Sequence, residues 1–154
     1  MPGQPQLGTN PLGVGINCTP VTLASAGLPN NLVIGMGDSF TVSTQVVLDG
    51  LLANAALSIP LNYSAEFFYE GMGSAAGEGS LAPAATGSTA AHAPGPLAGQ
   101  RNFVITSTPT TPGAQGMTPG VYEVSVVVTF TGPGGPWPIT CFATGPVIQV
   151  SAVV

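Results

Sequence analysis

The stretch TPGVYEVSVVVTF, from Thr118 to Phe130, decides the fold because its apolar and polar residues alternate almost without a break. Successive side chains of a β-strand point to opposite faces, so this alternation predicts a strand with one buried face. The residues predicted to point inward are Tyr122, Val124, Val126, Val128 and Phe130. On the opposite face only Glu123 carries a charge. A nearly uncharged outward face is the first unusual feature of the chain.

Similar segments recur between runs of Gly, Pro, Ser and Thr. Residues 40–48 (FTVSTQVVL), 61–70 (LNYSAEFFYE), 102–108 (NFVITST) and 139–154 (ITCFATGPVIQVSAVV) all have strand character, and Pro146 predicts an edge or a bulge in the last of them. No segment has a sustained helical period of apolar residues, so almost no helix is expected. A chain of 154 residues suits one domain. We therefore predict an all-β antiparallel sandwich of about seven or eight strands.

Two segments lie outside this strand pattern. Residues 1–17 are rich in Pro and Gly and lack alternation, which predicts an extended N-terminal arm before a sandwich domain at 18–154. Residues 71–101 are rich in Ala, Gly, Ser and Pro. A loop of that length exceeds what a passive connection needs, so we expect it to be functional, mobile or held by a partner.

The turn Pro119-Gly120-Val121-Tyr122 and the strand after it resemble strand F of immunoglobulin-like and fibronectin type III domains. The resemblance implies an immunoglobulin-like sandwich. It also implies that Tyr122 is a tyrosine-corner residue, whose hydroxyl bonds back to the preceding turn. The antibody hallmarks are missing, because Val124 stands where a cysteine would be and the strand at 61–70 has no Trp. The resemblance therefore concerns architecture and not function.

Cys18 and Cys141 are the only cysteines, which leaves two alternatives. They form one disulfide that ties together the two ends of the domain, or they are two buried thiols in a reducing compartment. On composition alone we favour the two thiols. A thiolate metal cluster is excluded because it needs more ligands.

The chain has one basic residue, Arg101, and six acidic residues. Charged residues make up 5% of the sequence, against about 25% in ordinary soluble domains. Without a basic patch we expect no nucleic-acid binding. Residues 46–61, the longest apolar region, are interrupted and shorter than the ~20 residues that span a bilayer, so no membrane insertion is expected. Residues 1–10 lack the basic and apolar regions of a signal peptide.

Catalysis has little support in the sequence. Gly37-Asp38-Ser39 resembles the GDS block of GDSL-type hydrolases, which would make Ser39 a nucleophile. That chemistry needs a histidine base, and His92, the only histidine, has no Asp three residues before it. Glu66 and Glu70 lie roughly 13 Å apart on one strand face, too far for a glycosidase pair at ~5–9.5 Å. We expect a protein that is not an enzyme and that has no cofactor and no metal site.

Trp137 stands between two prolines in GPGGPWPI. It is either an exposed platform on which a sugar ring stacks or a cover over the open end of the sandwich. The first alternative would make the chain a carbohydrate-binding or adhesion module that uses Trp137 and the adjacent loops.

Phe68 and Val127 are predicted to point outward from neighbouring strands. Two large apolar side chains on a face of Ser, Thr and Glu indicate that the segment 71–101 or another subunit covers them. The chain also has no lysine with which to protect its strand edges. We therefore predict a subunit of a repetitive assembly, such as a virion-surface decoration protein or an extracellular filament or sheath subunit. Its arm and uncharged surface would contact other protein subunits, as large particles or obligate oligomers.

Overall fold

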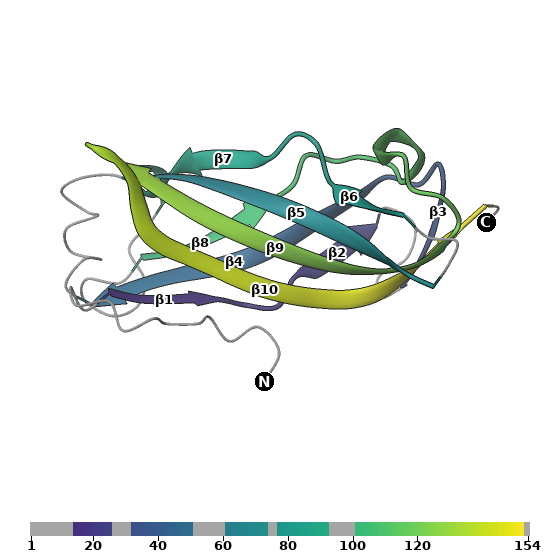
Figure 1. Ribbon diagram of the computed structural model, residues 1–154, viewed down its shortest axis with the longest axis horizontal. Coiled ribbons are helices and arrows are strands. Elements are labelled where there is room, and N and C mark those ends of the chain that lie inside the picture. Colours follow the sequence, from purple (N-terminus) through teal and green to yellow (C-terminus); the bar gives the residue numbers. More distant parts are fainter. Residues whose placement is uncertain (1–13, 26–31, 51–60, 74–76, 93–100, 153–154) are drawn as a thin grey trace.

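The computed structural model of the protein describes residues 14–25, 32–50, 61–73, 77–92 and 101–152. These residues form ten strands and two short 3-10 helices, with 67% of the structure in strands and 6% helical. The strands make two sheets that pack face to face (Figure 1). The predicted all-β sandwich is confirmed. The strand count exceeds the expected seven or eight, because short strands occur where the sequence predicts an arm and a loop.

The first sheet, called sheet A, is built around β4 (Phe40–Gly50), a long strand that has neighbours on both edges. One edge of this strand pairs with β8, and the other pairs with β1 and β2 in succession, all antiparallel. The strands are β1 (Val14–Cys18), β2 (Thr22–Ser25), β4 (Phe40–Gly50) and β8 (Arg101–Thr106).

The second sheet, called sheet B, has β9 at its centre between β5 and β10, all antiparallel. The far edge of β5 pairs with β6 and β7, and the end of β10 pairs in parallel with β3. The strands are β3 (Val33–Gly35), β5 (Asn62–Met72), β6 (Glu78–Ser80), β7 (Ala85–Ser88), β9 (Gly120–Gly132) and β10 (Gly135–Ser151). The 3-10 helices η1 (Thr89–Ala91) and η2 (Gly113–Gln115) lie in the connections.

The core is made by the alternate residues that the sequence predicts. Every residue predicted to point inward from β9 is buried. The alternate residues of the other predicted strands are buried as well, namely Tyr63, Ala65, Phe67 and Tyr69 of β5 and Phe103 and Ile105 of β8. Burial of each large apolar side chain contributes roughly 1.5–3 kcal/mol, so the two inner faces hold the sheets together.

The predicted arm boundary is wrong at its inner end. Residues 14–17 belong to β1, where Val14 pairs with Gly50 and Cys18 with Val46. A strand this short, with a glycine inside it, has no alternating pattern that the sequence could reveal. It is a strand because it pairs with β4. The remainder of the predicted arm, residues 1–13, lies outside the described residues.

The segment 71–101 is not a single loop. Its first two residues continue β5, and it then contributes β6, β7 and η1 to the edge of sheet B. The strands β6 and β7 could not be predicted because each has a glycine, Gly79 or Gly87, where an apolar residue would indicate a strand. Each glycine lies directly opposite a tyrosine of β5 and leaves room for its ring. A side chain at Gly87 would collide with the ring of Tyr63. Aromatic rings over edge glycines are a known way to stabilise such strands.

The interpretation of two separate thiols is wrong, because Cys18 and Cys141 form a disulfide between β1 and β10. Their Cα atoms are 6.1 Å apart and both residues are fully buried. The bond joins sheet A to sheet B across one side of the sandwich. On the same side the amide of Val21 donates to the carbonyl of Thr144 at 3.0 Å. The register of β10 shifts between Thr144 and Val147, so the bulge predicted at Pro146 is present.

The turn before β9 contains the hydrogen bond expected of a tyrosine corner. The hydroxyl of Tyr122 donates to the carbonyl oxygen of Thr118 at 2.7 Å and accepts from the amide of Thr118 at 3.1 Å. Tyr122 is fully buried. The hydroxyl therefore ties the turn to the core through one side chain.

Candidate interaction surface

The outer face of sheet B, the face that points away from sheet A, carries the unusual side chains of this protein. Cross-strand pairing arranges them in rows that run from β5 across β9 to β10. One row joins Glu66, Val127 and Phe142, and the next joins Phe68, Ser125 and Thr144. The pairing of β5 with β9 and the outward parity of Phe68 and Val127 are as the sequence predicts.

Phe68 and Val127 are each half-buried, so they are only part of the apolar surface. More exposed apolar side chains lie around them on the same face, and their exposed fractions are 49% for Phe142, 43% for Val147, 38% for Val121 and 54% for Met72. Sequence reasoning missed these four. Phe142 follows Cys141, and its outward direction could be read from the buried cysteine. That it lies against Val127 depends on the register of the β9–β10 hairpin, which the sequence does not fix.

Three glutamates lie side by side on this face, and we call them the glutamate row. Glu70 of β5 is directly opposite Glu78 of β6 on one side and Glu123 of β9 on the other. Val147 of β10 continues the row beyond Glu123. With Glu66, the face holds four of the six carboxylates of the chain. Like charges in directly opposite positions destabilise a sheet, so the row has a cost for the isolated fold.

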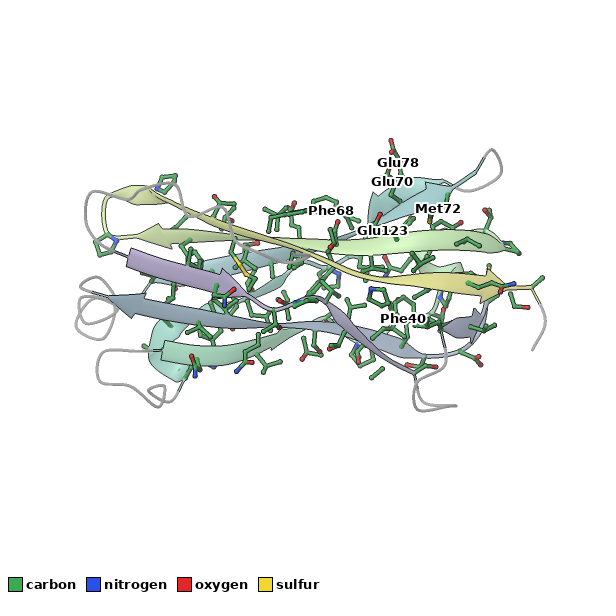
Figure 2. The ribbon with its side chains drawn as sticks, turned by 90° about the horizontal axis from the view of Figure 1, so that it is seen from below. Phe40, Phe68, Glu70, Met72, Glu78 and Glu123 are labelled. Atoms are coloured by element: carbon green, nitrogen blue, oxygen red, sulfur yellow. A yellow bond between two sulfur atoms is a disulfide. The ribbon has the colours of Figure 1, made fainter. Side chains whose placement is uncertain are left out.

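The glutamate row is bordered by apolar side chains and a hollow. Figure 2 shows Glu70, Glu78 and Glu123 on the same side of the molecule as Phe68 and Met72, whereas Phe40 of sheet A lies apart from them. A hollow of about 460 Å³ lies between β5 and β6, lined by Phe68, Glu70, Glu78 and Ser80 among others. Exposed apolar side chains and carboxylates therefore adjoin each other at this end of the face.

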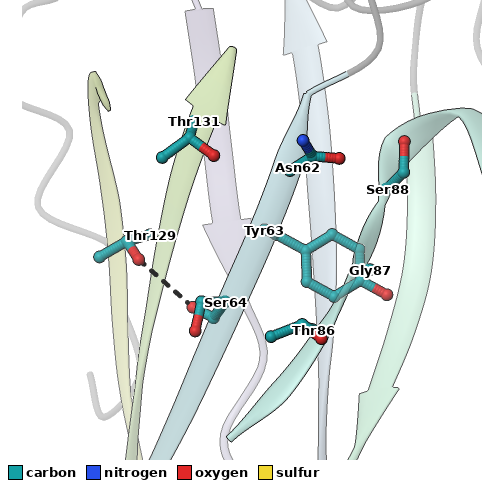
Figure 3. A pocket seen from close by; sticks show the side chains of 8 residues that line it. All are labelled: Asn62, Tyr63, Ser64, Thr86, Gly87, Ser88, Thr129 and Thr131. Carbon is teal, nitrogen blue, oxygen red and sulfur yellow. Dashed lines mark hydrogen bonds between the residues drawn. The ribbon is translucent and has the colours of Figure 1, made fainter. Parts of the chain in front are cut away.

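The other end of the same face has a different character. A hollow of about 550 Å³ is lined by hydroxyl and amide side chains of β5, β7 and β9, together with Tyr63 and Gly87 (Figure 3). The polar residues around it are Asn62, Ser64, Thr86, Ser88, Thr129 and Thr131. Pro136 of β10, which precedes Trp137 in the chain, lies opposite Thr131, one of the residues that line the hollow. The side chain of Trp137 lies outside the described residues.

The residues of the hydrolase-like motif serve local structure. The Asp38 carboxylate accepts a hydrogen bond from the amide of Gly35 at 2.9 Å and holds the turn before β4. The ring of His92 stacks on Phe103 at 4.5 Å and its Nε2 is 3.0 Å from the Tyr63 hydroxyl. Phe103 pairs with Val46, which is seven residues from Ser39, so the histidine lies about 23 Å from Ser39 along β4 at 3.3 Å per residue. The two residues are therefore not a nucleophile and its base.

Burial raises the pKa of two tyrosines at the edge of the sandwich above the ordinary 10.0. For Tyr63 the cause is loss of solvent around the phenol, and for Tyr69 the nearby Tyr122 adds a smaller contribution. The Tyr69 hydroxyl donates to the carbonyl of Gln115 at 2.9 Å. Both phenols therefore stay neutral and act as structural hydrogen-bonding groups near neutral pH.

In the part of the chain that the structure describes, no three His, Cys, Asp or Glu side chains gather closely enough to hold a metal ion. Within those same residues there is also no helix of the length and apolar character needed to cross a membrane. No model of a known protein family and no curated protein matches the chain.

Proposed function

We propose that the protein is a non-enzymatic structural subunit of a repetitive protein assembly, such as a virion-surface decoration protein or an extracellular filament or sheath subunit. In this proposal the outer face of sheet B is the contact with other protein. The observation that carries the proposal is the set of exposed apolar side chains on that face, with Phe142 opposite Val127 and Val147 opposite Glu123. Exposed apolar surface of this kind marks protein contacts.

The immunoglobulin-like architecture belongs to the same proposal. It is supported by the hydrogen bond of Tyr122 to Thr118 and by the order β8–β4–β1 in one sheet and β10–β9–β5 in the other. Sandwiches of this kind serve many functions, so the architecture adds no activity to the proposal.

The carboxylates on the face modify what association should look like. Copies that approach through this face bring their glutamate rows toward each other, and repulsion opposes the apolar contact. Salt screens this repulsion, because the Debye length falls from about 10 Å at 0.1 M salt to about 3 Å at 1 M. We therefore expect isolated copies to associate more strongly as salt is raised.

Size-exclusion chromatography with light scattering on the full chain tests this proposal. We expect a mass near the 15.2 kDa monomer at about 0.1 M NaCl and multiples of it at about 1 M. The double variant Phe142→Ser/Val147→Ser should stay monomeric at both salts. Val104→Ser, which changes an exposed valine of β8 in sheet A, is the matched control and should behave as the wild type. A wild type that is monomeric at both salts would contradict the proposal.

The second candidate function is a carbohydrate-binding or adhesion module. The hydroxyl-lined hollow beside Thr131 favours it, because sugars are bound by hydrogen-bonding side chains next to an aromatic platform, which Trp137 would supply. Trp137 is the only tryptophan, so its fluorescence reports on this site alone. A saturable fluorescence change with maltohexaose or cellohexaose, lost in Thr131→Val, would support this module in place of the assembly subunit.

A further inference from the structure

We propose that the glutamate row and its apolar border dock a basic, partly apolar segment of a different protein, and that a second copy of this chain does not take this position. The inference rests on the proposed function and specifies the partner. It follows from three observations on the outer face of sheet B: the charge of the row, its spacing and its border.

The charge of the row opposes docking of a second copy at low salt. A partner that covers Glu70, Glu78 and Glu123 must neutralise them, because buried carboxylates without a counter-charge are strongly unfavourable. The chain has a single basic residue, Arg101, which lies in β8 of the other sheet, and its net charge is −5. No surface of another copy offers three cations. The neutralising groups must come from a protein that has lysine or arginine.

The spacing of the row argues against a metal ion. Neighbouring strands lie about 4.8 Å apart, so the outer members of the row, on β6 and β9, are separated by about 10 Å. A calcium ion holds its oxygen ligands at about 2.3–2.6 Å. A line of separate cations matches the row better. A helix laid across the strands presents residues three or four positions apart at intervals of about 4.5–6 Å, close to the strand spacing.

The border of the row requires apolar groups on the same partner. Phe68 lies in the neighbouring row on one side, Met72 and Val121 lie in the neighbouring row on the other, and Val147 ends the glutamate row itself. Rows on one face are about 6.6–6.8 Å apart, and a helix with side chains is about 10–12 Å wide. A segment with basic residues along its centre and apolar residues at both sides would contact all three rows.

The test uses the full chain and a fluorescein-labelled amphipathic helical peptide with lysines on one face and leucines on both sides of them. Fluorescence anisotropy at low salt should show saturable binding. We expect Glu70→Gln/Glu123→Gln to weaken it about tenfold or more, and Phe68→Ser to weaken it severalfold. Glu66→Gln removes a carboxylate of the same face from outside the row and should change the dissociation constant little. Unfolding curves establish that each variant is folded.

Three results would overturn the inference. One is a dissociation constant that the double glutamate variant leaves unchanged. Another is that polylysine or a scrambled peptide binds as tightly as the amphipathic peptide and that Phe68→Ser leaves the dissociation constant unchanged. That result would mean diffuse charge attraction. The third is association of the wild type without peptide in calcium chloride, at an ionic strength at which sodium chloride has no effect, which would assign the row to a cation.

If the peptide does not bind while salt-driven association through Phe142 and Val147 occurs, the partner class is wrong and the assembly proposal stands. If both fail, the assembly proposal fails too.

Discussion

Single side chains do much of the work of closing this sandwich at its ends. The Tyr122 hydroxyl bonds the turn before β9, the Tyr63 ring lies over Gly87, and the Tyr69 hydroxyl bonds Gln115. Removing the hydroxyl of Tyr122 or of Tyr69 takes a hydrogen bond from a main-chain carbonyl, whereas the hydroxyl of Tyr63 contacts Nε2 of His92.

The substitution Tyr122→Phe tests the corner. It keeps the ring in the core and removes the hydrogen bond to Thr118, so we expect the free energy of unfolding to fall by about 1–3 kcal/mol. Urea denaturation measures the change, and salt-driven association should persist. A denaturation midpoint equal to that of the wild type would mean that the hydroxyl contributes nothing to the turn.

Raised tyrosine pKa values predict a loss of stability at alkaline pH. In the folded chain burial raises the pKa of Tyr63 and of Tyr69 above 10.0, whereas in the unfolded chain both titrate near that value. Above pH of about 10 the unfolded state therefore loses its phenolic protons first. The stabilisation is complete below that pH and disappears as pH rises through the folded-state pKa values.

Denaturation midpoints measured from neutral pH to above pH 10 check this, with Tyr63→Phe/Tyr69→Phe as the control. The control should start lower and decline less. The absence of lysine and the bonding of both cysteines remove the usual competing groups in this range. Equal slopes for the wild type and the double variant would assign the alkaline loss to another cause.

At the level of strands, the glutamate row conflicts with the stability of the sheet that carries it. Glu70 of β5 has a like charge directly opposite it on both neighbouring strands. We expect Glu70→Gln to raise the free energy of unfolding of the isolated chain by about 0.2–1 kcal/mol at low ionic strength. The gain should shrink as salt screens the row.

Thermal unfolding of the wild type and Glu70→Gln at two salt concentrations measures this, and Glu66→Gln is the control because it lies opposite Val127. A substitution that stabilises the fold and weakens binding of the basic peptide is the behaviour of a site kept for function. A destabilised Glu70→Gln would mean that the carboxylate has a structural partner.

Strands with long alternating patterns could be predicted from sequence, and short ones could not. The inward residues of β5 and β9 follow directly from alternation, and so does the outward direction of Phe68 and Val127. In contrast, β1, β6 and β7 have few residues and contain glycine, so their pairing comes from β4 and β5. The glutamate row joins residues from three strands, and only the register brings them together. The disulfide between β1 and β10 likewise depends on how the sheets pack.

For the whole molecule, the two sheets differ in what their outer faces present. Among the described residues, the outer face of sheet B carries four carboxylates and most of the exposed large apolar side chains, and the outer face of sheet A has the exposed Val104 of β8. The two outer faces of the sandwich therefore differ in charge and in apolar surface. A subunit of this kind would attach to a basic surface through sheet B and leave sheet A outward.

The most direct test of this account is to ask which face becomes covered when the protein associates. Valine methyl groups report on both faces: Val121 and Val147 lie at the glutamate row on sheet B, and Val104 lies on sheet A. Relaxation of these methyl signals by a soluble paramagnetic agent can be measured in the free chain and in the complex with the basic amphipathic peptide. We predict that the methyl groups of Val121 and Val147 become protected and that those of Val104 do not. Protection of Val104 alone, or no protection of the sheet B methyl groups in a bound complex, would contradict the account.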